Sequence, residues 1–94
     1  MSLEFTWSEE KSRTNLKKHG ISFDEASGVF LDERALLIRD LIHSVGEERF
    51  VLLGRSTKGA MLIVVHLYWE DQELIRIISA RRATRAEHLQ YFAR

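Results

Sequence analysis

Alternating apolar and polar positions predict five strands in this chain. From Leu3 to Trp7 apolar residues alternate with Glu4 and Thr6, as in a strand with one buried face. Apolar segments after the middle of the chain are separated by short polar stretches, which suit antiparallel hairpins. The predicted strands cover residues 3–7, 35–38, 49–54, 61–69 and 73–81.

Capping signals predict three helices between and after these strands. Ser8 can cap a polar helix that Gly20 ends, with Leu16 as its main apolar residue. Ser22 with Glu25 forms the pattern of a capping box and opens a second helix that ends near residue 32. The last helix, residues 85–92, begins after a second capping-box pattern, Thr84 with Glu87. Its expected apolar anchors are Leu89 and Phe92.

The resulting order is β-α-α-β-β-β-β-α in a single domain, residues 1–94. Helices kept apart from a hairpin-connected sheet predict an α+β fold with two layers. We expect a mostly antiparallel sheet with the helices on one face.

Composition narrows the class of protein. The chain has no cysteine, which excludes disulfides and thiolate metal sites. No signal peptide is visible at the N-terminus, and the longest apolar run, residues 61–65, is too short to span a bilayer. A cytoplasmic protein that does not insert into a membrane is therefore expected.

Charge is unevenly distributed, although the formal net charge is zero. Residues 1–48 contain 6 Lys/Arg and 10 Asp/Glu, whereas residues 49–94 contain 8 and 4. Arginine is concentrated between Arg76 and Arg85, where an apolar strand leads into a helix. Such a separation can present a cationic surface to a polyanion. The alternative is that these arginines are solvated or paired with the acidic half.

Alternation also predicts which arginines share a face of the sheet. Arg49 and Arg55 fall on the same face of their strand. Arg76 and Arg81 fall on opposite faces of the last strand, unless the chain bulges between them. A guanidinium within a sheet must reach solvent, a carboxylate or a phosphate, because an unpaired charge is not tolerated in a core.

Acid-base chemistry has few candidates. His43 lies in a polar loop near Glu48, and a histidine beside carboxylates can act as a general base near neutral pH. A simply solvated histidine is the alternative. His66 lies in the most apolar strand and is expected to be a core residue with satisfied hydrogen bonds. Three polar residues recur at helical spacing along the first helix, as a phosphate-facing, a partner-facing or a solvated surface. They are Lys11, Asn15 and Lys18.

Other catalytic motifs are absent from the sequence. No histidine and acid have metal-ligand spacing, and there is no glycine-rich phosphate loop, nucleophile elbow or cysteine nucleophile. Any catalysis is therefore expected to be acid-base and electrostatic, without a metal or another cofactor.

Taken together, these segments resemble the BrnT family of bacterial toxins over nearly the whole chain. The Lys-His-Gly and Ile-Ser-Ala-Arg segments are specific in combination. The sequence departs from the family at Ser8, where Asp is usual, and at Ala60, where a basic residue is common. The matching positions are Phe5, Trp7, Lys11, Asn15, residues 18–23, Glu25, Ala26, Val29, Phe30, Asp32, Asp40, His43, Ser44, Glu48, Arg49, Gly54, Ser56, Gly59, residues 76–81, Ala83, Thr84, Glu87 and Tyr91.

The resemblance implies a RelE-like fold and an endoribonuclease that inhibits translation. It also implies an antitoxin partner of the BrnA type, which carries the DNA-binding function, and a toxin homodimer within the toxin–antitoxin complex. RNA is cleaved without a metal when its 2′-hydroxyl attacks the adjacent phosphate, given a base, cations for the phosphorane and an acid for the leaving oxygen. Arginines and a histidine without a metal motif suit that scheme.

Roles then follow as hypotheses. Arg76 and Arg81 would stabilise the phosphorane, and His43 or Glu48 would be the general base. The remaining candidates would bind neighbouring RNA phosphates: Arg49, Arg55, Arg82, Lys11 and Lys18. One alternative is a non-enzymatic module that binds RNA or a protein through the same basic sheet. Another is a structural subunit whose arginines pair with the acids of a second copy.

Overall fold

A computed structural model of the protein describes residues 3–40, 42–69 and 73–94. The predicted order of strands and helices is confirmed within these residues, except that the second helix is short and continues as a 3-10 helix, η1. None of the described helices has the length and apolar character needed to cross a membrane. The elements are β1 (Glu4–Thr6), α1 (Glu9–His19), α2 (Phe23–Ser27), η1 (Gly28–Leu31), β2 (Leu36–Asp40), β3 (Arg49–Arg55), β4 (Met61–Trp69), β5 (Leu74–Arg82) and α3 (Arg85–Phe92).

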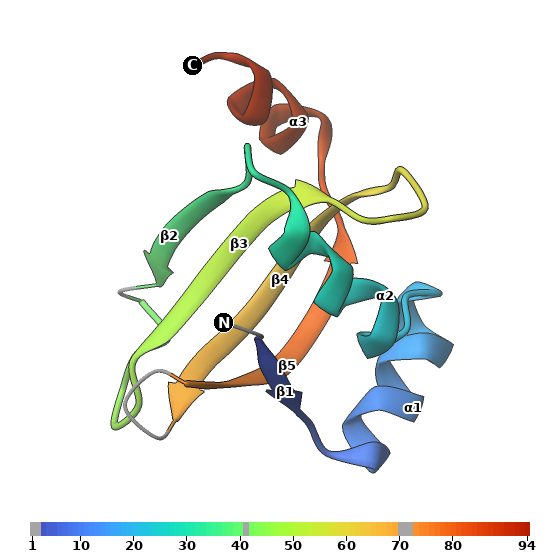
Figure 1. The fold of residues 1–94 in the computed structure, drawn as a ribbon, viewed down its shortest axis with the longest axis vertical. Helices are drawn as coiled ribbons and strands as arrows, with labels where there is room; N and C mark the ends of the chain where they lie inside the picture. Colours follow the sequence, from blue (N-terminus) through green and yellow to red (C-terminus); the bar gives the residue numbers. More distant parts are fainter. Residues whose placement is uncertain (1–2, 41, 70–72) are drawn as a thin grey trace.

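The five strands form one sheet in the order β1-β5-β4-β3-β2, visible at the centre of Figure 1. The hairpin-connected strands β2 to β5 are antiparallel, as predicted. The short β1 pairs with β5 in parallel, so the sheet is mixed. Alternation within a three-residue strand carries no information about a partner near the other end of the chain, which is why this pairing was not predicted.

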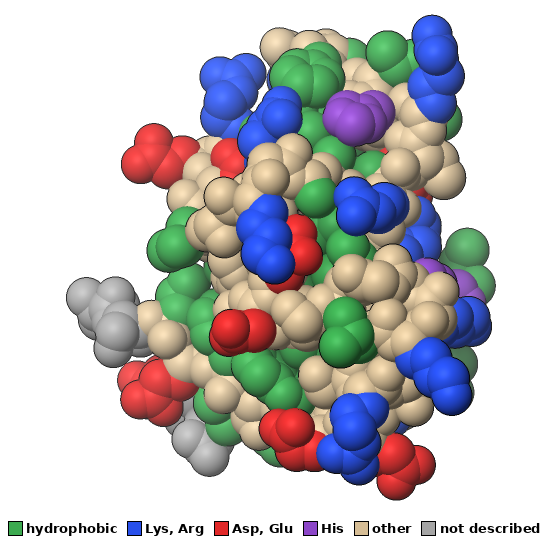
Figure 2. Space-filling view, turned by 90° about the vertical axis from the view of Figure 1, so that its right-hand side faces the viewer, with side chains coloured by type: hydrophobic (Ala, Val, Ile, Leu, Met, Phe, Trp, Pro, Cys, Tyr) green, Lys and Arg blue, Asp and Glu red, His purple; other side chains and the backbone are tan. Residues whose placement is uncertain are grey.

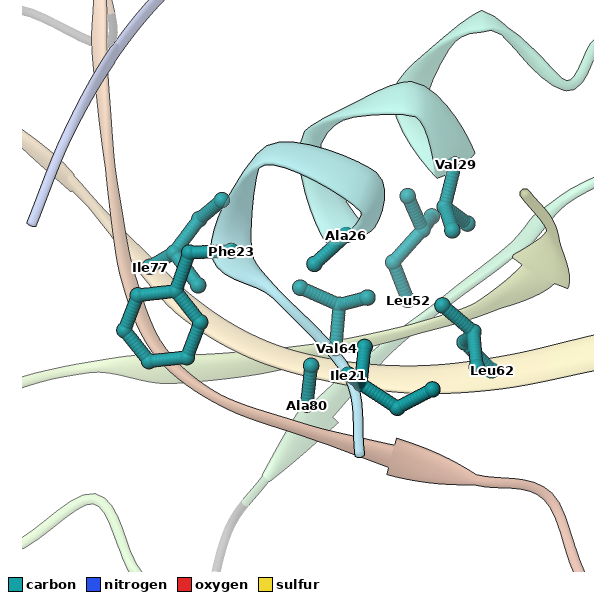
Figure 3. Packing of buried hydrophobic residues seen from close by; sticks show 9 residues of the cluster. All are labelled: Ile21, Phe23, Ala26, Val29, Leu52, Leu62, Val64, Ile77 and Ala80. Atoms are coloured by element: carbon teal, nitrogen blue, oxygen red, sulfur yellow. The ribbon is translucent and has the colours of Figure 1, made fainter. Parts of the chain in front are cut away.

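One face of the sheet is covered by α1, α2 and η1, and we call it the helix-covered face (Figure 1). Its core joins the start of α2 to the three central strands, and Figure 3 shows the side chains packed together. Trp7 adds an edge-to-face contact with Phe23, with 6.0 Å between ring centroids. The core residues are Ile21, Phe23, Ala26, Val29, Leu52, Leu62, Val64, Ile77 and Ala80.

The third helix corrects the expectation that all helices lie on one face. Tyr91 of α3 is buried against Leu53, Met61 and Ile63, which point away from the other helices. We call this opposite side the open face, because α3 covers only its end (Figure 1). The predicted anchors of α3 are also corrected, since Leu89 and Phe92 are 62% and 59% exposed. The capping box at the start of α3 is confirmed, and Tyr91 is the residue of this helix that is buried.

A bulge in β5 changes the faces of its arginines. Val65 pairs with Ser79 but His66 pairs with Ile77, so Ile78 is the extra residue. On either side of the bulge, Ile77 and Ala80 therefore both point into the helix-covered core, although they are three positions apart. Alternation alone would have placed them on opposite faces.

Asn15 corrects the predicted polar side of α1. It is buried, with its amide oxygen accepting the Ala80 backbone N–H at 3.1 Å and its amide nitrogen donating to the Ala80 carbonyl at 2.8 Å. A second donation reaches the Ile21 carbonyl at 2.9 Å. The side chain thus pairs with the edge of β5 where β1 has ended, while Leu16 is half exposed. Asn15 is therefore a structural residue rather than part of a phosphate-facing surface.

Candidate active site

The open face carries four of the predicted arginines. Strand pairing places Arg55 beside Met61 and Arg81 beside Ile63, in the cluster under α3. The bulge puts Arg76, beside Leu67, on the same face as Arg81. Arg49 shares this face because it lies two residues before Val51, as alternation predicted. Arg49, Arg55 and Arg76 form no ion pair within the described part of the chain.

A hollow of about 390 Å³ opens on this face beside α3. Its apolar floor comes from β3 and β4, and polar side chains from β2, the following loop, β5 and α3 surround this floor. The hollow thus brings the predicted catalytic residues His43 and Arg81 to one site. The floor is Val51, Leu53, Ile63 and Val65, and the remaining lining residues are Ile38, Arg39, Asp40, His43, Arg81, Glu87 and Gln90.

His43 is held by Asp40. Its Nδ1 lies 3.0 Å from Asp40 Oδ2, and its backbone N–H donates to Asp40 Oδ1 at 3.2 Å. Burial raises the pKa of Asp40, but the hydrogen bonds from His43 outweigh this effect. The pKa of Asp40 therefore lies below its usual value. A carboxylate at Nδ1 selects the tautomer with hydrogen on that atom, which leaves Nε2 able to accept a proton.

Ser44 fixes the loop that carries His43. Its hydroxyl donates to the Asp40 carbonyl and accepts the Arg49 backbone N–H at 3.0 Å. These bonds join the end of β2 to the start of β3 across the turn. His43 is therefore positioned by its neighbours even though 67% of its side chain is exposed.

Arg81 is held by Glu87 across the start of α3. Its two terminal nitrogens donate to the two Glu87 oxygens at 2.8 and 2.9 Å. Glu87 also accepts the Thr84 backbone N–H at 2.8 Å, which completes the capping box. The hydrogen bonds from Arg81 lower the pKa of Glu87 to about 2 and raise that of Arg81. Arg81 thus remains charged and has a fixed direction, while 42% of its side chain stays exposed.

The other two catalytic candidates lie elsewhere. Glu48 forms an ion pair with Arg39 and lines a second hollow, of about 240 Å³, together with Trp69. The Arg76 guanidinium lies over the Trp69 ring, with Cζ 4.9 Å from its centroid. Arg76 and Arg81 pair with Leu67 and Ile63, which are four positions apart on β4, so the two arginines are roughly 13 Å apart along the sheet. The structure therefore separates the four candidates into the pair His43 and Arg81 and a more distant pair near Trp69.

The remaining RNA-binding candidates are dispersed. Arg55 lies near Phe92, with Cζ 5.7 Å from the ring centroid. Lys11 and Lys18 line a hollow of about 240 Å³ between α1 and the β5 bulge, beside His19 and Ser79. Arg82 pairs with Leu62, so it lies on the helix-covered side, away from the other arginines.

In Figure 2, which views the molecule from the side, Lys and Arg side chains are most numerous at the upper end and along the right, with Asp and Glu side chains interspersed among them and along the left and lower edges. In the part of the chain that the structure describes, no group of three or more histidines and acids is placed to hold a metal ion.

His66 is a core residue, as predicted. It is fully buried, with Nδ1 3.1 Å from the Val64 carbonyl and Nε2 3.2 Å from the Tyr68 hydroxyl. Burial lowers the pKa of His66, so the ring is neutral near pH 7. Phe30 and Phe50 pack against it, which makes His66 part of an aromatic cluster.

Asp40 and Glu87 were not predicted as site residues. Asp40 lies three residues before His43 in a turn, and that spacing was a usable signal for a hydrogen-bonded pair. Glu87 was predicted only as a helix cap. Its contact with Arg81 depends on how the chain turns between β5 and α3, which the sequence pattern does not specify.

Comparisons with known proteins bear on the fold and the family of the chain. The fold matches the crystal structure of the Brucella abortus ribonuclease toxin BrnT with a TM-score of 0.68 and 21% identity, over 89% of this chain and 100% of that chain. No curated protein sequence matches. A likeness to RelE stays a prediction. The model of the family described as "Ribonuclease toxin, BrnT, of type II toxin-antitoxin system" matches residues 7–87. The chain therefore belongs to the BrnT family of ribonuclease toxins.

Proposed function

We propose that this protein is an endoribonuclease toxin that inhibits translation by cleaving RNA without a metal ion. The observation that carries the proposal is that His43 and Arg81 both line the hollow beside α3. A base and a fixed cation at one phosphate are the two main groups that cleavage through the 2′-hydroxyl requires. Family membership supports the substrate class.

In the proposed reaction His43 is the general base. Its Nε2 takes the proton of the 2′-hydroxyl while the 2′-oxygen forms a bond to phosphorus. The bond between phosphorus and the 5′-oxygen breaks, and this oxygen takes a proton from a water molecule, to which the His43 imidazolium returns its proton. The products are a 2′,3′-cyclic phosphate and a 5′-hydroxyl. Asp40 stabilises the imidazolium that forms, because its carboxylate is hydrogen-bonded to Nδ1.

Arg81 is the proposed stabiliser of the phosphorane. Its bidentate bond to Glu87 directs the guanidinium without covering it completely. A preorganised cation contributes more than a mobile one, because no reorganisation is needed as charge develops. The partial neutralisation by Glu87 is offset by this fixed geometry.

The other arginines of the open face are proposed to bind phosphates on either side of the cleaved bond. Arg49 and Arg76 lie toward the far end of the sheet from α3, and Arg55 lies near α3. His43 is a better general-base candidate than Glu48, because Glu48 is paired with Arg39 and borders a different hollow. Lys11, Lys18 and Arg82 lie outside this face and are proposed at most as peripheral contacts.

The proposed partner is an antitoxin of the BrnA type, with a toxin homodimer inside the complex and action in the cytoplasm. Covering the open face would exclude RNA from both His43 and Arg81 at once. The apolar floor of the hollow supports this, since a protein partner could bury it.

The test is RNA cleavage by the purified, EDTA-treated protein in a bacterial translation extract, which supplies ribosomes. New 5′-hydroxyl and 2′,3′-cyclic phosphate ends are expected from the metal-stripped protein. Binding of RNA without any cleavage, by folded protein, would support the non-enzymatic module instead. Cleavage of purified RNA without ribosomes that EDTA abolishes and added metal restores would contradict the metal-independent mechanism.

A further inference from the structure

The Arg76 guanidinium lies over the partly exposed Trp69 ring at the end of the open face opposite α3. The Arg76 Cζ lies 4.9 Å from the Trp69 ring centroid, and an Arg76 terminal nitrogen lies 3.5 Å from the Thr6 hydroxyl oxygen. Trp69 remains 41% exposed despite this contact. The pairing of β1 with β5 places Thr6 beside Arg76, so three strands build this end of the face.

Next to Trp69 lies the hollow of about 240 Å³ lined by Glu47, Glu48, Phe50, Leu67, Tyr68 and Trp69. This is below the volume of about 300–1,000 Å³ that is typical of sites for drug-sized ligands. It suits one flat group that lies against the indole from the hollow. Arg76 does not line the hollow but lies over the Trp69 ring, and of the two carboxylates in the lining Glu48 is paired with Arg39.

We propose that Trp69 and Arg76 form a binding subsite for one nucleobase of single-stranded RNA. Unpaired bases stack on aromatic rings and guanidinium planes, and stacking accepts any base. The base would stack on the Trp69 indole beside the Arg76 guanidinium, while Arg49 on the same face binds the adjoining phosphate. This subsite rests on the proposed function, since RNA is its ligand.

The position of the subsite relative to the hollow beside α3 supports RNA over a smaller ligand. The β5 bulge puts Arg76 and Arg81 on one face, roughly 13 Å apart along the sheet. A chain that reaches both must be several nucleotides long. The subsite therefore holds a base some nucleotides away from the cleaved bond and contributes affinity and register rather than chemistry.

The experiment uses two labelled oligomers that the protein cannot cleave by 2′-hydroxyl attack. One is a short 2′-deoxy oligonucleotide, and the other is an abasic oligomer with the same number of phosphates. Anisotropy titrations compare wild type with Trp69→Ala, Trp69→Phe and Arg76→Gln. Leu31→Ala removes another exposed apolar side chain from outside the open face and serves as the control. Circular dichroism confirms that each variant is folded.

Trp69→Ala is expected to weaken binding of the base-bearing oligomer about tenfold or more, and to leave abasic binding unchanged. Trp69→Phe should retain part of the affinity, because it keeps a flat ring. Arg76→Gln should weaken both oligomers and reduce the salt dependence of binding. Equal binding of the base-bearing oligomer by wild type and Trp69→Ala would overturn the proposal, as would an equal loss for both oligomers.

Failure of this proposal is distinguishable from failure of the proposed function. If wild type cleaves RNA and Trp69→Ala binds and cleaves like wild type, only the subsite is overturned. If wild type does not cleave RNA but Trp69→Ala loses base-dependent binding, the subsite is supported and the catalytic proposal fails.

Discussion

Glu87 binds both terminal nitrogens of Arg81, at 2.8 and 2.9 Å, and at the same time caps α3 through the Thr84 backbone N–H. One carboxylate therefore links the orientation of a proposed catalytic cation to the start of the helix that covers the end of the open face. Stability and activity are coupled at this position, and the pH dependence of folding reports on it.

Glu87→Gln is expected to reduce stability at neutral pH by about 1 kcal/mol, because the cap and its charge are weakened. The folded-state pKa of about 2 lies below the ordinary 4.5, so Glu87 stabilises the fold fully above pH 4.5. This contribution is lost as the pH falls from 4.5 toward 2. Urea unfolding at several pH values should show a smaller acid-induced loss for Glu87→Gln than for wild type. An equal loss would contradict the assignment.

His43 and Asp40 are expected to act as a unit in cleavage. His43→Ala should lower kcat about 100-fold or more, because the proposed general base is removed. Asp40→Asn should also lower kcat, by about tenfold or more, since the tautomer and the imidazolium lose their carboxylate. Adding Asp40→Asn to His43→Ala should have little further effect. Kinetics with single-stranded RNA would measure this, and additive losses would contradict a shared role.

His66 is expected to make folding sensitive to mild acid. Burial lowers its pKa below the ordinary 6.5, so the unfolded chain binds the proton more readily. This contribution to stability is fully present above pH 6.5 and is lost as the pH falls below that value. Unfolding free energies between pH 7.5 and 5.5 should decrease more steeply for wild type than for His66→Gln. Parallel pH profiles would show that the buried ring does not control this dependence.

Gly54→Ala is expected to destabilise the protein by about 1–3 kcal/mol through overpacking. A Cβ at this position would lie 2.8 Å from both the Ala35 Cβ and a Val29 methyl group, and 3.1 Å from Asp32. Asp32 accepts the Tyr91 hydroxyl at 2.8 Å, so the strain would reach α3. Thermal unfolding measures the loss. Adding Ala35→Gly should recover part of it, and an unchanged melting temperature for Gly54→Ala would contradict the packing.

The sequence predicted the elements of this fold better than their faces. Helix caps and strand alternation are local signals, which is why Ser8, Gly20 and Thr84 gave the helix ends. The faces of Arg76 and Arg81 depended on one extra residue at Ile78, and a bulge leaves no clear mark in an apolar run. Tyr91, and not the predicted Leu89, anchors α3, because its ring packs against the sheet and its hydroxyl donates to Asp32.

The candidate site was predictable in part. Alternation correctly placed Arg49 and Arg55 on one face. The sequence did not show whether His43 or Glu48 would share a hollow with Arg81. That depends on the tertiary structure, in which β2, the loop after it and α3 come together around the hollow. The edge-capping role of Asn15 was likewise hidden, since its partner Ala80 lies 65 residues away.

The most direct measurement is RNA cleavage in a bacterial translation extract by EDTA-treated, purified wild type, Arg81→Ala and Arg85→Ala. Arg85→Ala removes an exposed arginine at the start of α3 and is the matched control for charge. Our account predicts that wild type and Arg85→Ala cleave RNA, and that folded Arg81→Ala is slower by roughly 100- to 1,000-fold. Cleavage by Arg81→Ala at the wild-type rate would contradict the proposed site.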